Sequence, residues 1–327
     1  MKKSFIVSVA LAVTVVGASS LEASNHAQRA KSIQKEISFH NKNFKVASKD
    51  IQKGLGNTIK AIQALEKNRV KIAQKNLGDA TKEFDKALKI DPKLGLVPLE
   101  ENLVAYEYRG TPKNIKDALK IARSMLAKNN LQFARDILTP LKDEIDITTH
   151  YLPMDLYPDS TKMAAKLLAK GKKKKALREL QFGLSMIVGD QVIIPIPLLS
   201  AQDLVIMASK IDKTKKNQTS KLLKRAQMEL QKAKLLGYTS AHSKEYKSLE
   251  NKIKSIQKEI KGKNEAEKLY SSIKGDFKSL VHKTRGDKKS FDSDSVWNNT
   301  QNRKKSATQE EDKDVVNFAQ KSKLDAF

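Results

Sequence analysis

The side chains best suited to bind a ligand lie in one short segment, HYLPMDLY, from His150 to Tyr157. It brings together an imidazole (His150), two phenols (Tyr151 and Tyr157) and a carboxylate (Asp155). Loops held by a rigid scaffold often carry binding groups. A structural interpretation fits the same residues, since Asp155 can cap the following helix and the tyrosines can fill a junction between helices. We therefore treat these four residues as candidate binding residues and leave the structural interpretation open.

Catalytic motifs are absent from the sequence. The five histidines are far apart, and none forms an HxxxH or HExxH pair that would suit zinc. No Walker A or GxSxG pattern occurs, and Gly54-x-Gly56 lacks the third glycine of a nucleotide loop. The chain has no cysteine, which excludes disulfides, thiolate metal sites and a cysteine nucleophile. The sequence thus predicts neither an enzyme nor a cofactor or metal site.

The first residues have the pattern of a secretory signal peptide. A positive start, Met1 to Lys3, precedes an apolar run from Phe5 to Gly17 that is too short to span a bilayer. Small residues follow, and cleavage is expected after Ser20 or after Ala23. We expect residues 1–23 to be removed and the mature protein to be periplasmic, with an uncleaved membrane anchor as the alternative.

The chain is strongly basic, with 63 Lys and Arg against 37 Asp and Glu. The net charge of +26 stays near +25 without the predicted signal peptide, and residues 284–327 contribute little of it. Such a charge attracts anionic lipid, acidic polymers or acidic unfolded chains. Of the 63 basic residues 54 are Lys, so a general lysine bias on solvated helix faces explains the charge as well. Export makes nucleic acid an unsuitable partner.

Helical periodicity dominates the body of the protein. Helix is expected from Asn25 to about Leu88 with an interruption near Gly54 to Gly56, and again from Ile115 to Lys142 with a break at Asn129-Asn130. Asp91-Pro92 and the stretch from Glu107 to Pro112 break the helical pattern. Residues 284–327 are rich in polar residues and are expected to be disordered.

Three segments share one spacing, with a Leu before a polar turn and an Ala and a Leu after it. Each also has a Lys two residues after the first Leu. The spacing of Leu, polar turn and Ala is typical of an αα-hairpin, in which the small Ala lets the returning helix approach closely. The units start 61 and 42 residues apart, an irregular spacing that disfavours a regular solenoid. The triplets are Leu65-Ala73-Leu77, Leu126-Ala134-Leu138 and Leu168-Ala176-Leu180.

Two segments, Thr148 to Pro158 and Val192 to Leu199, do not read as helix. Pro195 and Pro197 remove backbone donors and favour extended geometry, while the neighbouring Ile and Leu residues favour burial. We expect the two segments to pair as short strands or to cover each other.

The chain from Leu138 to Leu280 resembles the YfdX family of exported bacterial proteins. The resemblance rests on the stretches DITTHYLPMDLYPDSTKMAAKLLAKGKKKKAL, QVIIPIPLLSAQDLVIMAS and AKLLGYTSAHSKEYKSLENKI. It implies an all-helical periplasmic protein linked to stress responses, chaperone-like or ligand-binding, with no established enzymatic activity. The C-terminal extension and the high lysine content depart from the family.

We therefore predict an all-α bundle of irregular helical hairpins with one or two short extended apolar segments. Residues 24–283 would form the YfdX-like domain, with the best match at 138–280. The expected function is non-catalytic binding or chaperone-like activity on unfolded or acidic envelope proteins. The alternative is an envelope-associated scaffold that binds anionic lipid or polymer through lysines. The sequence predicts no specific ligand and no oligomeric state.

Overall fold

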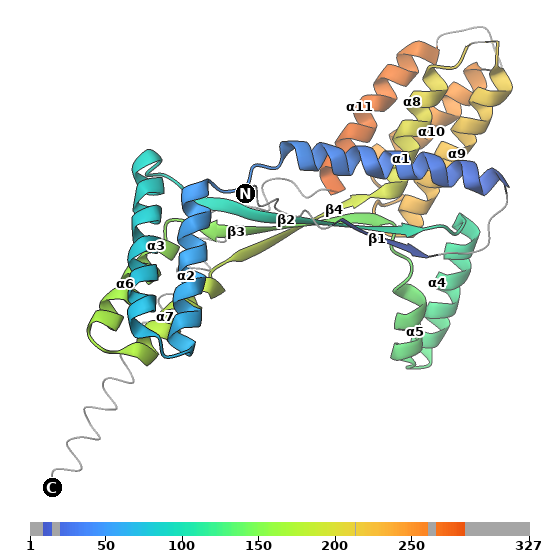
Figure 1. Cartoon of the computed structure of the whole chain (residues 1–327). Coiled ribbons are helices and arrows are strands. Elements are labelled where there is room, and N and C mark those ends of the chain that lie inside the picture. The colour runs from blue at the N-terminus through green and yellow to red at the C-terminus, as the bar shows by residue number, and fades with distance from the viewer. Residues whose placement is uncertain (1–8, 15–19, 213, 261–265, 285–327) are drawn as a thin grey trace. The chain divides into compact units, whose positions relative to one another are not determined.

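The computed structural model describes residues 9–14, 20–212, 214–260 and 266–284. Helices dominate these residues, as predicted, but the all-α prediction is only partly right because a sheet is also present (Figure 1). Its strands are hydrogen-bonded in the order β1-β2-β3-β4. They are β1 (Val9–Thr14), β2 (Leu96–Tyr108), β3 (Glu144–Pro153) and β4 (Val188–Pro195).

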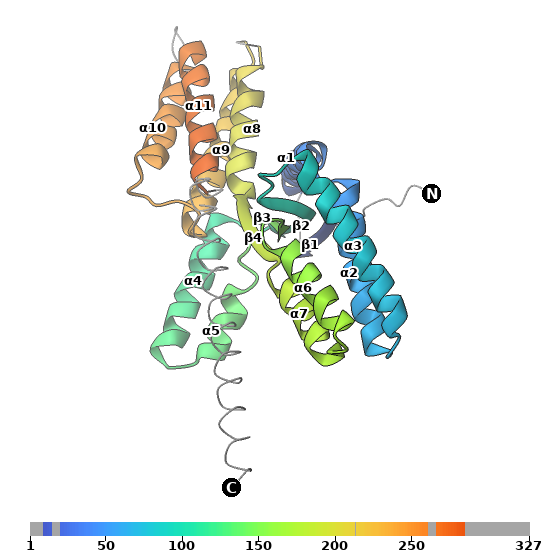
Figure 2. The ribbon, with the colours of Figure 1, turned by 90° about the vertical axis from the view of Figure 1, so that its left-hand side faces the viewer.

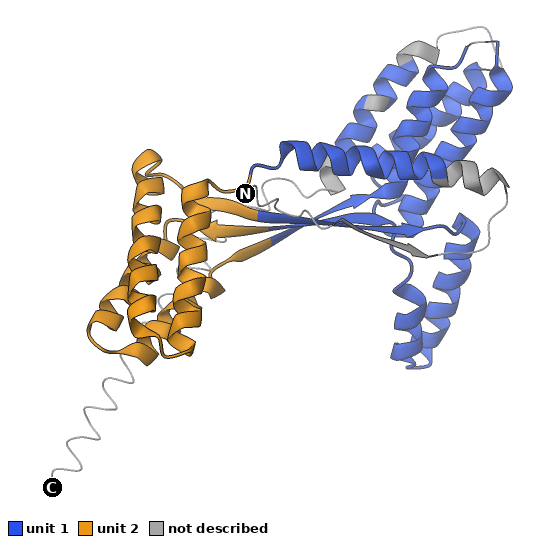
Figure 3. Ribbon diagram, viewed as in Figure 1, with its two compact units in different colours: residues 1–45, 100–149, 190–287 blue, residues 46–99, 150–189, 288–327 orange. Residues whose placement is uncertain are grey.

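The chain divides into two compact units (Figure 3). Unit 2 comprises residues 46–99, 150–189 and 288–327, and its helices are α2 (Lys49–Glu66), α3 (Val70–Ile90), α6 (Tyr157–Ala169) and α7 (Lys173–Ser185). Unit 1 comprises residues 1–45, 100–149 and 190–287. Its helices are α1 (Ser20–Asn43), α4 (Pro112–Ala127), α5 (Leu131–Leu138), α8 (Ile196–Ser209), α9 (Lys216–Leu235), α10 (Lys244–Glu259) and α11 (Ala266–Thr284).

The two segments predicted to be extended are neighbours in the sheet, as β3 and β4, which confirms the expected strand pairing. The prediction is wrong from Ile196 onwards, because α8 begins there. Pro197 lies in the first turn of α8, where no backbone donor is needed. Strand β2 was not predicted. Its alternating pattern, with Leu103, Ala105 and Glu107 buried and Val104 and Tyr106 half-buried, identifies it in the structure.

The break in the first helical stretch also differs from the prediction. Gly54 and Gly56 lie inside α2, and the chain leaves helical geometry earlier, between α1 and α2. A Cβ at Gly54 would come within 2.7 Å of the Phe84 ring. Gly54 therefore lets α2 and α3 approach closely and does not interrupt the helix.

The three predicted hairpins are confirmed, as α2–α3, α4–α5 and α6–α7. Their turns have one geometry: the C-cap of the first helix is a Lys, and the next residue has a positive φ, 58° at Asn68, 57° at Asn129 and 74° at Gly171. The residue after that donates its N–H back to the preceding helix in each turn. The shared turn is thus a repeated structural unit.

In unit 2 the first and third hairpins pack on each other, α3 against α6 and α2 against α7 (Figure 2). Their contact is apolar, and both Leu-Ala-Leu triplets lie in it with at most 2% of each residue exposed. A second cluster in the same unit centres on Phe84 and Tyr157. Apolar packing of equivalent hairpins therefore forms the core of unit 2.

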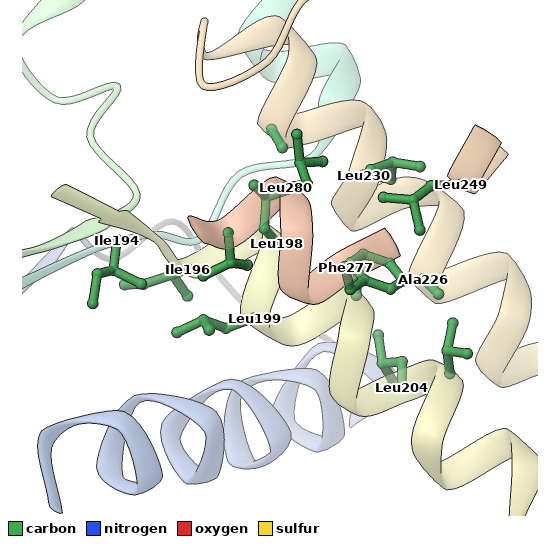
Figure 4. Close-up of a cluster of buried hydrophobic side chains, with 14 of the residues drawn as sticks. Ile194, Ile196, Leu198, Leu199, Leu204, Ala226, Leu230, Leu249, Phe277 and Leu280 are labelled. Carbon is green, nitrogen blue, oxygen red and sulfur yellow. The ribbon is translucent and has the colours of Figure 1, made fainter. Parts of the chain in front are cut away.

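Unit 1 has a larger apolar core, in which α8 packs against α1, α9 and α11 (Figure 4). Helix α8 buries nine of its fourteen residues, because it is apolar on most sides. Phe277 and Leu280 of α11 and Ala226 and Leu230 of α9 complete this core. The hairpin α4–α5 belongs to this unit and contacts α9 through α4.

The predicted signal peptide falls partly outside the described residues. Val9–Thr14 form β1, which pairs in parallel with Leu103 to Tyr108 of β2, and α1 begins at Ser20. Within the described residues, no helix combines the length and the apolar character that a membrane span requires. The tail predicted to be disordered lies beyond the described residues except for Thr284.

Candidate functional site

The four candidate binding residues come from three places in unit 2. His150 and Tyr151 lie near the end of β3, Asp155 lies in the turn that follows, and Tyr157 begins α6. Asp155 is exposed, whereas Tyr157 is 1% exposed. The residue at the N-cap of α6 is Leu156, without a side-chain cap. The four side chains thus differ too much in burial to share one surface.

Tyr157 is part of the core. Its ring meets the Phe84 ring edge to face, with 5.5 Å between ring centroids, and Gly183 leaves room beside it. Burial raises the pKa of the Tyr157 hydroxyl well above its ordinary value. The environment of Tyr157 agrees with the structural interpretation of this residue.

His150 lies beside Gly189, the second residue of β4. A Cβ at Gly189 would be 3.6 Å from the His150 ring, an ordinary van der Waals distance, so the imidazole packs directly against β4. Both His150 and Tyr151 are half-buried. Of the four candidates, these two and Asp155 retain surface that a ligand could reach.

A charged cluster is buried in unit 1, around Arg29 of α1. Arg29 forms ion pairs with Asp143 and Glu229, and its Nε lies 3.3 Å from Glu107 Oε1. Lys232 of α9 adds a contact of 3.2 Å from its Nζ to Asp143 Oδ2 and donates to the Tyr108 carbonyl oxygen at 3.0 Å. The cluster therefore joins α1, β2 and α9 to the residue just before β3.

The electrostatics of this cluster indicate a structural role, in which buried ion pairs hold elements of unit 1 together. Burial by itself lowers the pKa of Arg29, but the carboxylates of Asp143 and Glu229 raise it above the ordinary value. Arg29 is therefore a permanent cation. The cavity next to it, lined in part by Ser200 and Arg225, has a volume of about 30 Å³, enough for about one water molecule.

Metal chemistry finds no support in the described part of the chain. Nowhere in it do three or more His, Asp or Glu side chains gather as a metal ion would require.

Besides the buried Arg29, unit 1 holds a half-buried titratable side chain, His40. It lies between Glu36 and Glu101, with 3.7 Å from His40 Nδ1 to Glu101 Oε1. Although burial lowers the pKa of His40, hydrogen bonds with these carboxylates raise it to about 9.

Basic side chains gather at the turns of the two hairpins of unit 2. Lys173 Nζ donates to Asn68 Oδ1 at 2.7 Å, so the two turns lie side by side. We call the basic residues at these turns the basic tip. It consists of Lys67, Arg69, Lys71, Lys170, Lys172, Lys173, Lys174 and Lys175, all exposed except for the half-buried Lys173.

The basic tip was not predicted as a site. Its signal is visible in the sequence, since Lys170 to Lys175 contain five lysines and each hairpin has a Lys two residues after the first Leu of its triplet. What the sequence does not show is that two such turns are adjacent. Glu66 is the acidic residue that adjoins Lys67 in the chain.

Comparison with known proteins supports the family resemblance over part of the chain. Residues 55–193 match the model of the YfdX protein family. No curated protein matches the chain. Among solved structures, Salmonella Typhi YfdX is similar, with 15% sequence identity, coverage of 46% of this chain and 98% of that chain, and a TM-score of 0.32. The resemblance to the YfdX family is thus confirmed for residues 55–193, the region that contains all three hairpin turns, and the chain carries a YfdX region there.

Proposed function

We propose that this chain is an exported, stress-linked, non-catalytic binding protein that holds acidic unfolded segments in a chaperone-like manner. The observation that carries the proposal is the basic tip of unit 2. Export is inferred from residues 1–23, and the link to stress from the YfdX resemblance.

The tip has the properties that such binding requires. Seven lysines and one arginine from two adjacent turns create a positive field that attracts acidic chains over roughly one Debye length, about 8 Å at physiological salt. Ile72, at the start of α3, is 50% exposed and offers an apolar contact beside these charges. A surface that combines flexible cations with apolar area suits clients of varied sequence.

The test is suppression of aggregation by the purified chain at equimolar ratio, with one acidic and one basic client protein. We expect suppression for the acidic client, weakening as salt is added. Neutralising Lys172, Lys173, Lys174 and Lys175 to Gln should remove most of it. The matched control neutralises four exposed lysines of α10, Lys244, Lys247, Lys254 and Lys258, and should retain it.

Three results contradict the proposal. They are unchanged aggregation of the acidic client, equal protection of both clients, and equal loss in the tip variant and the α10 variant. The control matters because both variants lose the same net charge, so a difference between them reports the position of the charge.

A second candidate function is adhesion to anionic envelope lipid or polymer through the same tip. The predominance of lysine favours it, since point charges bind diffuse anionic surfaces without the paired geometry that arginine provides. Retention on vesicles containing anionic lipid, lost at high salt and absent on neutral vesicles, is the expected result. Salt-independent retention, or none, would exclude this candidate.

A further inference from the structure

The small cavity of unit 1 lies next to the buried charge cluster, between α1, α8 and α9. Its volume of about 30 Å³ restricts it to a ligand of about the size of a water molecule. Leu204 of α8 supplies an apolar part of the wall (Figure 4). Besides Arg29, the polar side chains of the lining are Gln28, Ser200, Arg225 and Glu229.

Ser200 lies in the wall of this cavity without a hydrogen-bond partner. It is 0% exposed, and among the described residues nothing bonds to its Oγ. A serine inside a helix often donates back to a carbonyl oxygen of the preceding turn, as Ser32 of α1 does to Gln28 over 3.2 Å. A fully buried hydroxyl is unfavourable without such a bond. Its position therefore points to a ligand that accepts its hydrogen.

Arg225 is a second side chain of the lining that lacks a partner of its own. It is half-buried, and it forms no ion pair or hydrogen bond within the part of the chain that the structure describes. Burial lowers the pKa of Arg225, and the carboxylate of Glu229 offsets only part of this effect. Glu229 is already engaged in an ion pair with Arg29. A guanidinium withdrawn from water needs a counter-ion, and the nearest carboxylate is shared.

The charges of the buried cluster and of Arg225 do not balance. Ion pairs join Arg29, Arg109 and Lys232 to carboxylates of the cluster, so that Arg225 is the cation left over among these residues. The group consists of Glu107, Asp143, Glu229, Arg29, Arg109, Lys232 and Arg225. One negative charge beside Arg225 would make this group neutral.

We propose that the cavity binds one small monovalent anion, of the size and charge of chloride, through the guanidinium of Arg225, the hydroxyl of Ser200 and the amide of Gln28. All three groups can donate hydrogen bonds, as an anion requires, and those from a guanidinium to an anion are strong. Chloride is only slightly larger than a water molecule, so it suits the volume. Because its ligands come from three helices, the bound anion joins α1, α8 and α9.

Other ligands of similar size suit the cavity less well. A water molecule would satisfy Ser200 but would leave the charge of Arg225 uncompensated. A metal cation would be repelled by Arg29 and Arg225, since both guanidinium groups line the cavity. Phosphate and sulfate are too large for it. The lining thus selects by charge as well as by size.

The test compares the thermal stability of the full chain in sodium chloride and in sodium gluconate, each at about 150 mM so that screening is equal. Gluconate is too large for the cavity. We expect chloride to raise the thermal midpoint by roughly 2 to 4 °C, because a ligand that binds only the folded state stabilises it. Bromide should act as chloride does. Equal midpoints in chloride and gluconate would overturn the proposal.

The variant Arg225→Gln removes the proposed counter-charge and should abolish the difference between the two salts. The matched control, Arg123→Gln, removes the same charge from an exposed position on α4 and should retain the difference. This control is needed because anions also interact with the many other cations of the surface. A salt difference that persists in Arg225→Gln would place the anion elsewhere and contradict the proposal.

The variant Ser200→Ala separates anion binding from a purely structural role. It should reduce the chloride effect, but in gluconate it should be at least as stable as the unchanged chain, because a buried hydroxyl without a partner is removed. Loss of stability in both salts, with the chloride effect unchanged, would assign Ser200 to the core alone.

The anion can also be located directly, which keeps the proposal testable if Arg225→Gln does not fold. In crystals of the full chain grown with sodium bromide, anomalous scattering should place bromide within hydrogen-bond distance of Ser200 Oγ and the Arg225 guanidinium. Bromide bound only outside the cavity would exclude the site.

Discussion

The two compact units stabilise their helices in different ways. Unit 2 packs two equivalent hairpins through a contact with an apolar core, and its Lys162–Asp85 and Lys86–Asp50 ion pairs involve partly exposed side chains. Unit 1 adds to its apolar core a buried charge cluster around Arg29 and an imidazole between two carboxylates. The stability of unit 1 should therefore be sensitive to changes of charge and pH, and the stability of unit 2 to changes of side-chain volume.

The largest expected effect is on the charge cluster. Arg29→Ala leaves Asp143 and Glu229 buried without their main cation, which should lower the free energy of unfolding by about 4 kcal/mol. Urea denaturation measures it. The control, Lys162→Ala, removes a partly exposed ion pair of unit 2 and should change little. An equal loss of unfolding free energy in the two variants would show that the buried cluster does not stabilise the fold more than an exposed ion pair does.

Equivalent leucines of two hairpins give the next test. Leu65→Ala creates a cavity in the unit 2 core and should cost about 3 kcal/mol. Leu126→Ala removes a side chain that is 45% exposed and should cost less than about 0.5 kcal/mol in dilute protein. Thermal unfolding compares the two variants. Similar costs would mean that α4–α5 is covered within a single chain.

The stability of unit 1 should depend on pH through His40. Its pKa is about 9 in the folded protein, above the ordinary value of 6.5, so protonation stabilises the fold. This contribution is complete below pH 6.5 and is lost as the pH rises through 9. Allowing for partial exposure, it amounts to about 1 kcal/mol.

The variant His40→Gln should remove that pH dependence while leaving the rest of the curve in place. Urea midpoints at pH 6 and pH 9.5 measure it for both proteins. An unchanged difference between the two midpoints in the variant would assign the dependence to other groups.

The smallest effect concerns the shared turn. Asn68→Gly and Asn129→Gly should each stabilise the protein by about 0.5 kcal/mol, because glycine adopts the positive φ without strain. Gly171→Ala should destabilise it by about 1 kcal/mol for the same reason. Destabilisation by either Asn→Gly substitution, or stabilisation by Gly171→Ala, would show that the three turns are not equivalent. Thermal midpoints of the three single variants measure these stability changes.

Much of the local structure could be predicted from the sequence. The spacing of Leu65, Ala73 and Leu77 and of its two counterparts predicts hairpins, since helix geometry and turn chemistry act over a few residues. The extended segment predicted from Val192 to Leu199 is right only as far as Pro195, because Pro197 lies in the first turn of α8. Strand β2 escaped prediction because its hydrogen-bond partners lie far away in sequence. Gly54 was misread because the Phe84 ring that requires it belongs to another helix.

At the candidate site, too, local sequence features could be predicted and contacts between distant residues could not. Nothing local distinguishes Tyr157, which is buried, from Tyr151, which is half-buried. The lysines of Lys170 to Lys175 are evident in the sequence, but their position beside Lys67 depends on how two hairpins pack.

The sequence by itself determined the basic charge, the hairpins and their turns, because these follow from composition and from contacts within a few residues. The tertiary structure alone decided which hairpin leucines are buried, where the lysines gather and that Arg29 meets Asp143. Each of these depends on contacts between residues distant in the chain, and the periodicity of one helix does not encode the partner that will cover it.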